Sequence, residues 1–286
     1  MSTNSVAKVV LVTGCSDGGI GSALCAEYAS RGCKVYATAR RMEAMHGLTH
    51  SNVEKLVLDV TDEKNINDVV DTVISKEGRI DVLVNNAGVL CIGPVIDVSM
   101  DVIEKTYDAN VFSVIRMCKA VIPHMAVHKS GTIVQISSVG AYIPTPWAGI
   151  YASTKAALHS LSDTLYMECT PLNISVLTVT TGAVRSNIGT NQVAIRPASF
   201  VPENSLYRAF LSDILSRVFM SQGPDSMPAE DYARLVVGKS LQKKPPRELM
   251  LGGKTLLYRL LLWIPRTLTL KFFWRYFTQK TRAEAA

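Results

Sequence analysis

The sequence lacks the features that mark an exported or metal-binding protein. Its six cysteines form no CxxC pair and no spacing typical of a disulfide framework. The five histidines are scattered, so no cluster has the spacing of metal ligands. An apolar strand-like run begins within a few residues of the N-terminus and leaves no export signal in front of it. We therefore expect a metal-free protein that works in a reducing compartment.

Long apolar runs are also missing, and so are acidic residues near the C-terminus. The longest uninterrupted apolar run of residues 255–277 is five residues, 260–264, whereas a membrane-spanning helix needs about 20. Residues 254–282 contain seven Lys and Arg but no Asp or Glu; without these seven, the 30 basic residues become 23 against 24 acidic ones. The net charge of +6 therefore belongs to this tail, and nothing favours a nucleic-acid partner.

The tail, residues 254–286, mixes aromatic, aliphatic and basic residues on both sides of Pro265. This composition predicts two short amphipathic helices that lie in the interface of an anionic bilayer. We expect contact through residues 254–282 with the cytoplasmic face of the endoplasmic reticulum or of a lipid droplet. Packing of the same segment on the protein or across a dimer, and a cytosolic location, are the alternatives.

What the chain does have is a regular alternation of apolar runs. Its 286 residues, 48% hydrophobic and 19% charged, are sufficient for one large α/β domain. Strand-length runs alternate with helix-like patterns, at 8–12, 34–40, 53–58, 80–84, 131–138 and 174–179, and 248–251 follows as a short last strand. This predicts a doubly wound parallel sheet (a Rossmann fold) over residues 1–253, with ligands at the carboxyl ends of the strands.

The turn after the first strand predicts a dinucleotide-binding site. Thr13-Gly-Cys-Ser-Asp-Gly-Gly-Ile-Gly21 lies between a strand and a helix, where glycines let the backbone approach a pyrophosphate and the helix N-terminus favours its charge. From this turn we assign Gly14, Ser16, Gly19 and Ile20 to the cofactor.

The second strand ends in Ala39-Arg40-Arg41, where NAD-binding folds carry an acidic residue for the ribose hydroxyl. An arginine there favours the 2′-phosphate of NADP(H), and Arg40 is assigned to it. Asp59 and Val60, which follow the third strand, are assigned to the adenine end.

A second group of residues suggests proton transfer to a carbonyl oxygen. Tyr151 and Lys155 are four residues apart in a helical pattern, so they lie on one helix face, and the cation would lower the pKa of the phenol. Ser138 ends the fifth strand, from which its hydroxyl could hold the same oxygen. Asn110 lies within an apolar helix-like run over 102–117, where its amide would either hold a water molecule or brace a helix.

These motifs together resemble the short-chain dehydrogenase/reductase family over residues 7–252. The resemblance implies that Tyr151 is the general acid/base, that Lys155 lowers its pKa and holds the nicotinamide ribose, that Ser138 positions the carbonyl and that Asn110 sustains a proton relay through water. It also implies dimers or tetramers. Further cofactor contacts are carried over to Asn86, Ala87, Gly88, Val184 and Ser186.

The sequence departs from the family pattern at two places. Four residues, not three, separate Gly14 from Gly19, so either Gly18 or Gly19 contacts the pyrophosphate. Thr181-Gly182 replaces the usual Pro-Gly after the sixth strand, which affects the contacts expected of Val184 and Ser186.

The expected reaction is the NADPH-dependent reduction of a ketone to a secondary alcohol. Residues 187–228 contain prolines, aromatic and aliphatic residues and few charges, which predicts a lid over an apolar substrate. Within the family the chain resembles the reductases of 1-acyl-dihydroxyacetone phosphate, and steroid or terpenoid reductases are the alternative. Two other classes are a lipid ester hydrolase that uses Ser16 of a G-x-S-x-G match, and a cofactor-binding scaffold without turnover.

Overall fold

The computed structural model describes residues 7–190, 201–279 and 281. A seven-stranded sheet has the order β3-β2-β1-β4-β5-β6-β7, and every pair of neighbouring strands is parallel. The predicted doubly wound fold is therefore confirmed. The strands are β1 Val9–Thr13, β2 Lys34–Ala39, β3 Val53–Val57, β4 Val82–Asn85, β5 Gly131–Ser138, β6 Ile174–Thr181 and β7 Glu248–Leu251.

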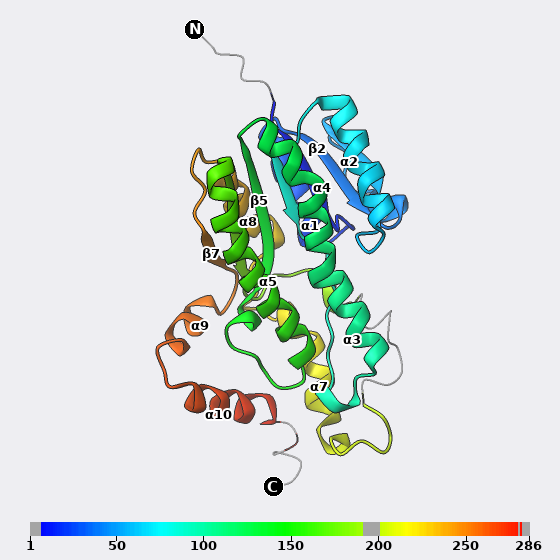
Figure 1. Ribbon diagram of the computed structural model, residues 1–286. Coiled ribbons are helices and arrows are strands. Elements are labelled where there is room, and N and C mark those ends of the chain that lie inside the picture. Colours follow the sequence, from blue (N-terminus) through cyan, green and yellow to red (C-terminus); the bar gives the residue numbers. More distant parts are fainter. Residues whose placement is uncertain (1–6, 191–200, 280, 282–286) are drawn as a thin grey trace.

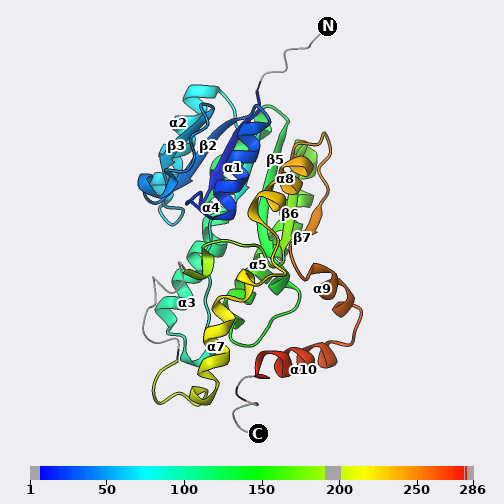
Figure 2. The ribbon, with the colours of Figure 1, turned by 180° about the vertical axis from the view of Figure 1, so that it is seen from behind.

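Helices cover both faces of the sheet, α2, α4 and α5 on one (Figure 1) and α1 and α8 on the other (Figure 2). The strand sequence explains both layers, because Val9 and Leu11 of β1 pack toward α2 and α4, and Val10 and Val12 toward α1 and α8. The helices are α1 Ile20–Ser30, α2 Glu63–Glu77, α3 Met100–Tyr107, α4 Ser113–Val127, α5 Gly149–Cys169, α7 Leu211–Val218, α8 Ala229–Ser240, α9 Thr255–Leu261 and α10 Arg266–Phe277.

The predicted helix over 102–117 is not one regular helix. A π-helical turn, Asp108–Phe112, joins α3 to α4 and contains Asn110. Such turns insert an extra residue into the helical repeat and are frequent at functional sites. The apolar periodicity does not reveal this insertion, which turns the buried Asn110 amide toward the loop after β4.

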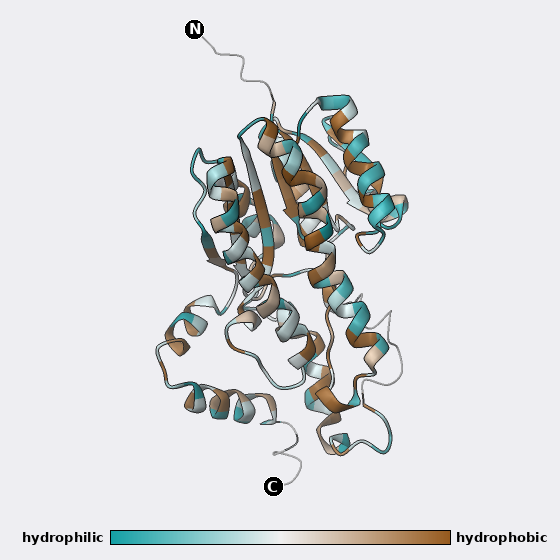
Figure 3. Ribbon diagram, in the orientation of Figure 1, coloured by the Kyte–Doolittle hydropathy of each residue, from teal (hydrophilic) through white to brown (hydrophobic). Residues whose placement is uncertain are grey.

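The tail forms two short helices separated by Pro265, as predicted. Tyr258 and Leu261 of α9 and Phe273 and Phe277 of α10 are buried with residues that follow β5. Figure 3 shows brown and teal residues interleaved along α10. In the described part of the chain no helix has both the length and the apolarity needed to cross a bilayer.

The predicted lid is described in part. Residues 191–200 lie outside the described residues, as do Lys280 and Arg282 of the tail. Within the described part, Ile214 and Val218 of α7 pack with Ile92 and Trp147. Helices α7, α9 and α10 all lie beyond the carboxyl ends of the strands (Figures 1 and 2).

Candidate active site

A cavity of about 330 Å³ opens at the carboxyl ends of the strands. Its walls come from the turn after β1, the ends of β2 to β6, the start of α5, helix α7 and the start of α9. The structure brings nearly all the predicted residues to this one cavity: Gly14, Ser16, Gly19, Ile20, Arg40, Asp59, Val60, Asn86, Ala87, Gly88, Ser138, Tyr151, Lys155, Val184 and Ser186. Asn110 does not line it.

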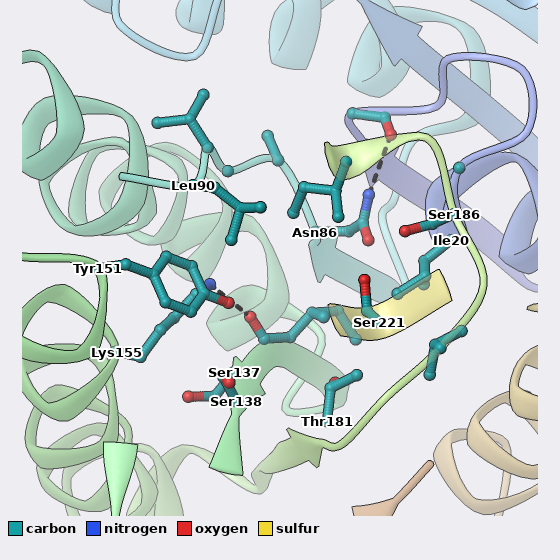
Figure 4. Close-up of a pocket in the computed structure, with 18 of the residues that line it drawn as sticks. Ile20, Asn86, Leu90, Ser137, Ser138, Tyr151, Lys155, Thr181, Ser186 and Ser221 are labelled. Carbon is teal, nitrogen blue, oxygen red and sulfur yellow. Dashed lines mark hydrogen bonds between the residues drawn. The ribbon is translucent and has the colours of Figure 1, made fainter. Parts of the chain in front are cut away.

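Tyr151, Lys155, Ser137 and Ser138 lie on one side of this pocket, opposite Ile20, Asn86 and Ser186 (Figure 4). The Nζ atom of Lys155 lies 5.9 Å from the centre of the Tyr151 ring and donates a hydrogen bond to the carbonyl oxygen of Ile136 at 3.0 Å. The predicted Tyr–Lys pair and the serine at the end of β5 are thus brought together.

The surroundings of Tyr151 act on the pKa of its phenol in opposite directions, and the lowering of that pKa by Lys155 stays a prediction. Burial raises the pKa of the Tyr151 phenol, and hydrogen bonding with Ser138 and the charge of Arg217 only partly oppose that shift. Lys155 is not among the opposing groups; burial lowers the pKa of its own ammonium group to about 8. Desolvation of the charged form of Tyr151 thus has a larger effect on its pKa than the nearby cation.

Asn110 braces the site from behind. Its Nδ2 donates to the Val89 carbonyl oxygen at 2.9 Å and to Thr154 Oγ1 at 3.0 Å, and its Oδ1 accepts from the Val89 amide at 2.8 Å. The side chain therefore ties the loop after β4 to α5. Of the two roles expected of Asn110, the bracing of a helix is the one that these hydrogen bonds show. The water relay stays a prediction.

The turn after β1 is held by the end of β4. Asn86 Nδ2 donates to the carbonyl oxygens of Thr13 and Gly14 at 2.8 and 3.0 Å. A Cβ atom on Gly21 would lie 2.3 Å from the Gly14 oxygen and 2.6 Å from Asn86 Nδ2, so only glycine fits there. Gly19 lines the cavity, whereas a side chain on Gly18 would meet Asn187. Gly19 is therefore the better placed of the two for a pyrophosphate.

The residues present fit a nicotinamide dinucleotide. Ser137 Oγ is buried at the cavity wall and has no hydrogen-bond partner among the described residues, and such an oxygen is stabilised when a ligand bonds to it. The turn from Gly14 to Ile20 would cradle the pyrophosphate, and Arg40 is exposed at the rim. The described residues contain no group of three or more possible metal ligands.

Comparisons with known proteins agree with this geometry. The model of the short chain dehydrogenase family matches residues 8–196. The chain belongs to the short-chain dehydrogenase family. The NADPH-dependent 1-acyldihydroxyacetone phosphate reductase of Schizosaccharomyces pombe is 39% identical to this chain over 209 residues, which are 73% of this chain and 70% of that reductase. This chain is 36% identical over 272 residues, 94% and 92% of the two chains, to the short-chain dehydrogenase virD of Hypocrea virens.

A solved short-chain dehydrogenase from Streptomyces avermitilis superposes with a TM-score of 0.76 at 32% identity, covering 89% of this chain and 91% of its own. The protein is thus an NAD(P)-dependent oxidoreductase that acts on CH–OH or C=O groups.

Sequence reasoning missed a charged group on the substrate side of this short-chain dehydrogenase. Arg217 of α7 lines the cavity and lies within electrostatic reach of the Tyr151 phenol. The sequence around it has weak patterning and no motif, so no local signal could have identified it. Ser137 and Tyr258 were missed for the same reason, because their place at the cavity depends on packing between distant segments.

Proposed function

We propose that this short-chain dehydrogenase reduces the ketone of an apolar lipid substrate with NADPH, and that 1-acyl-dihydroxyacetone phosphate is the first candidate. The observation that carries this proposal is the meeting of Tyr151, Ser138 and Lys155 in one cavity whose outer wall is built from the apolar lid and tail helices. The relative from S. pombe named for that reaction supports the substrate.

The cofactor is NADP(H). Arg40 follows Ala39 at the end of β2 and lies exposed at the cavity rim, where its guanidinium suits a 2′-phosphate. The relative from S. pombe is named as NADPH-dependent. When bound, the cofactor supplies the hydride that the carbonyl carbon accepts.

Tyr151 donates the proton that the carbonyl oxygen takes up, and Ser138 holds that oxygen with its hydroxyl. Burial keeps the pKa of Tyr151 above its ordinary value, so at neutral pH the phenol is protonated, which is the form that a ketone reduction uses. Lys155 holds the nicotinamide ribose from the same helix face, four residues from Tyr151.

The outer part of the site suits an acyl chain. Tyr258 of α9 lines the cavity and packs with Val139, Ile143 and Phe273. Beyond it, α9, α10 and the link between them leave large apolar side chains exposed, including Trp263 at 90% and Leu256 at 71%. We propose that this exposed face rests on an anionic membrane surface and that the substrate enters from there. We also propose that this membrane is that of the endoplasmic reticulum or of a lipid droplet. The protein is further proposed to form dimers or tetramers.

The test is NADPH oxidation by the purified protein with 1-hexadecanoyl-dihydroxyacetone phosphate and with a panel of steroid and terpenoid ketones. Tyr151→Phe removes the proton donor and should abolish turnover while NADPH binding, measured by fluorescence, is kept. Tyr166→Phe is the matched control, because Tyr166 is exposed on the same helix. Full turnover in Tyr151→Phe would contradict the assigned acid.

No observation favours the hydrolase. A hydrolase would need a histidine at Ser16, and in the described residues no hydrogen bond joins the Ser16 hydroxyl to a histidine. A steroid or terpenoid ketone remains the alternative substrate, and the ketone panel decides between it and the acyl phosphate. Absence of NADPH oxidation with every ketone would favour the scaffold.

A further inference from the structure

Arg217 brings a positive charge into the substrate side of the cavity. It belongs to α7, lines the cavity and lies within electrostatic reach of the phenols of Tyr151 and Tyr258. Its Nε and Nη2 atoms both donate to Thr145 Oγ1, at 3.2 and 3.1 Å. The centre of the guanidinium group lies 5.4 Å from the ring centre of Phe277 in α10. Helix α7, the loop before α5 and the tail therefore hold the side chain in one orientation.

In the part of the chain that the structure describes, this charge has no carboxylate partner. Within the described residues Arg217 forms no ion pair, and the groups that act on its charge are the two phenols. Burial lowers the pKa of the guanidinium group, as expected of a cation taken partly out of water. The acidic residues described at the cavity, Asp17 and Asp59, belong to the turn after β1 and to the end of β3, on the cofactor side.

A partly buried cation without a counterion is stabilised when a ligand supplies the opposite charge. The bond geometry leaves donors for such a ligand, because Thr145 takes the single N–H of Nε and one of the two on Nη2, and the described residues take none from Nη1. A phosphate or a carboxylate matches the remaining fork of donors. Lys254 at the start of α9 also lines the cavity and adds positive charge to the same region.

We propose that Arg217 binds an anionic group of the substrate, a phosphate or a carboxylate, and selects ketones that carry one. The inference rests on the proposed ketone reductase function and deepens it: the carbonyl lies at Tyr151 and the anionic group on the guanidinium of Arg217. A neutral steroid or terpenoid ketone would leave this charge without a partner.

The experiment compares three ketones of equal chain length: 1-hexadecanoyl-dihydroxyacetone phosphate, a long-chain γ-keto acid and a neutral long-chain methyl ketone. The protein variants are wild type, Arg217→Met, Arg217→Lys and the control Arg208→Met. Arg208 lies just before α7, bonds to the Val201 carbonyl oxygen and does not line the cavity. The measured quantity is kcat/KM for each ketone, together with the Kd of NADPH and the thermal midpoint of each variant.

In Arg217→Met the ratio of kcat/KM for the anionic ketones to that for the neutral one should fall about 10- to 100-fold, mainly through KM. Arg217→Lys keeps the positive charge but lacks the planar fork of N–H donors, so the ratio should fall less than in Arg217→Met. Arg208→Met should leave the ratio unchanged. A loss with the phosphate alone identifies a phosphate site, and an equal loss with the keto acid identifies a general anion site; both support the proposal.

An unchanged ratio in a folded Arg217→Met protein would overturn the role of Arg217 and leave the reductase proposal intact. A loss of NADPH affinity as large as the loss of kcat/KM would also overturn it, by assigning the cation to the cofactor. If Arg217→Met does not fold, an unchanged ratio in Arg217→Lys is the overturning result. If the wild type reduces none of the three ketones, both proposals fail.

Discussion

Phe277, the last residue of α10, lies beneath the guanidinium group of Arg217, 5.4 Å from ring centre to Cζ. The basic tail therefore contacts a residue of the active-site wall through α10, in addition to forming an exposed surface. Trp147 strengthens this connection, because its indole N–H donates to the Phe277 carbonyl oxygen at 3.5 Å and its ring packs against Trp274. Substitutions in α10 should therefore alter substrate binding through this contact.

Phe277→Leu should raise KM for the anionic ketone by about 2- to 5-fold, because a cation over an aromatic face is stabilised by about 0.5–1 kcal/mol. The leucine keeps most of the apolar volume, so the fold should be preserved. Steady-state kinetics measure the effect, and Phe272→Leu is the control, because Phe272 is 43% exposed on the same helix. An equal change in both variants would show that the effect is not specific to Arg217.

Lys155 should make stability depend on pH. Burial lowers the pKa of its ammonium group to about 8 in the folded protein, whereas an unfolded lysine titrates near ~10.4. Between these values the unfolded state binds more protons, so this contribution to the free energy of unfolding rises as pH increases from about 8 to ~10.4.

Lys155→Met should therefore be more stable than the wild type at neutral pH, by about 2–3 kcal/mol at most, and should lose this rise with pH. Urea unfolding at neutral pH and at about pH 10 measures both effects. Lys243→Met changes an exposed lysine and serves as the control. A wild-type stability that falls across this window would contradict the direction of the pKa shift.

Gly21→Ala should weaken NADPH binding strongly. The new methyl group would lie 2.3 Å from the Gly14 carbonyl oxygen, a backbone atom that cannot move without displacing the turn. We expect the Kd of NADPH to rise about 100-fold or more, since the cradle depends on close backbone approach. Gly238→Ala in α8 is the control, because its nearest contact, Arg31, is at an ordinary 3.5 Å. Retained affinity in Gly21→Ala would show that the turn adapts.

Trp263→Ser should weaken binding to anionic vesicles. Trp263 is 90% exposed between α9 and α10, and an indole at this place would insert into the headgroup region. Cosedimentation with phosphatidylserine-containing vesicles should show a several-fold loss of bound protein, and added salt should weaken binding further. Val127→Ser removes an apolar residue that is 80% exposed at the end of α4 and should have no effect. If wild-type protein does not cosediment, the membrane proposal fails.

Several features of this chain were predictable because they are encoded by neighbouring residues. The strand of residues 131–138 and that of 248–251 have the predicted bounds, since a short apolar run bounded by turn residues is a local signal. The glycine turn at 14–21 and the two tail helices around Pro265 were predicted for the same reason. The π-helical turn at Asn110 was not, because hydrophobic periodicity tolerates one inserted residue without a visible break.

The sequence alone determined the parallel sheet, the dinucleotide turn and the serine, tyrosine and lysine at its edge, because each depends on residue type at fixed local spacing. Only the tertiary structure decided the electrostatics of the site. The pKa of Tyr151 is set by burial against segments far away in the chain, and Arg217 reaches the cavity because α7 and α10 pack together there. Desolvation and the meeting of distant charges arise from packing, which no local pattern of residues records.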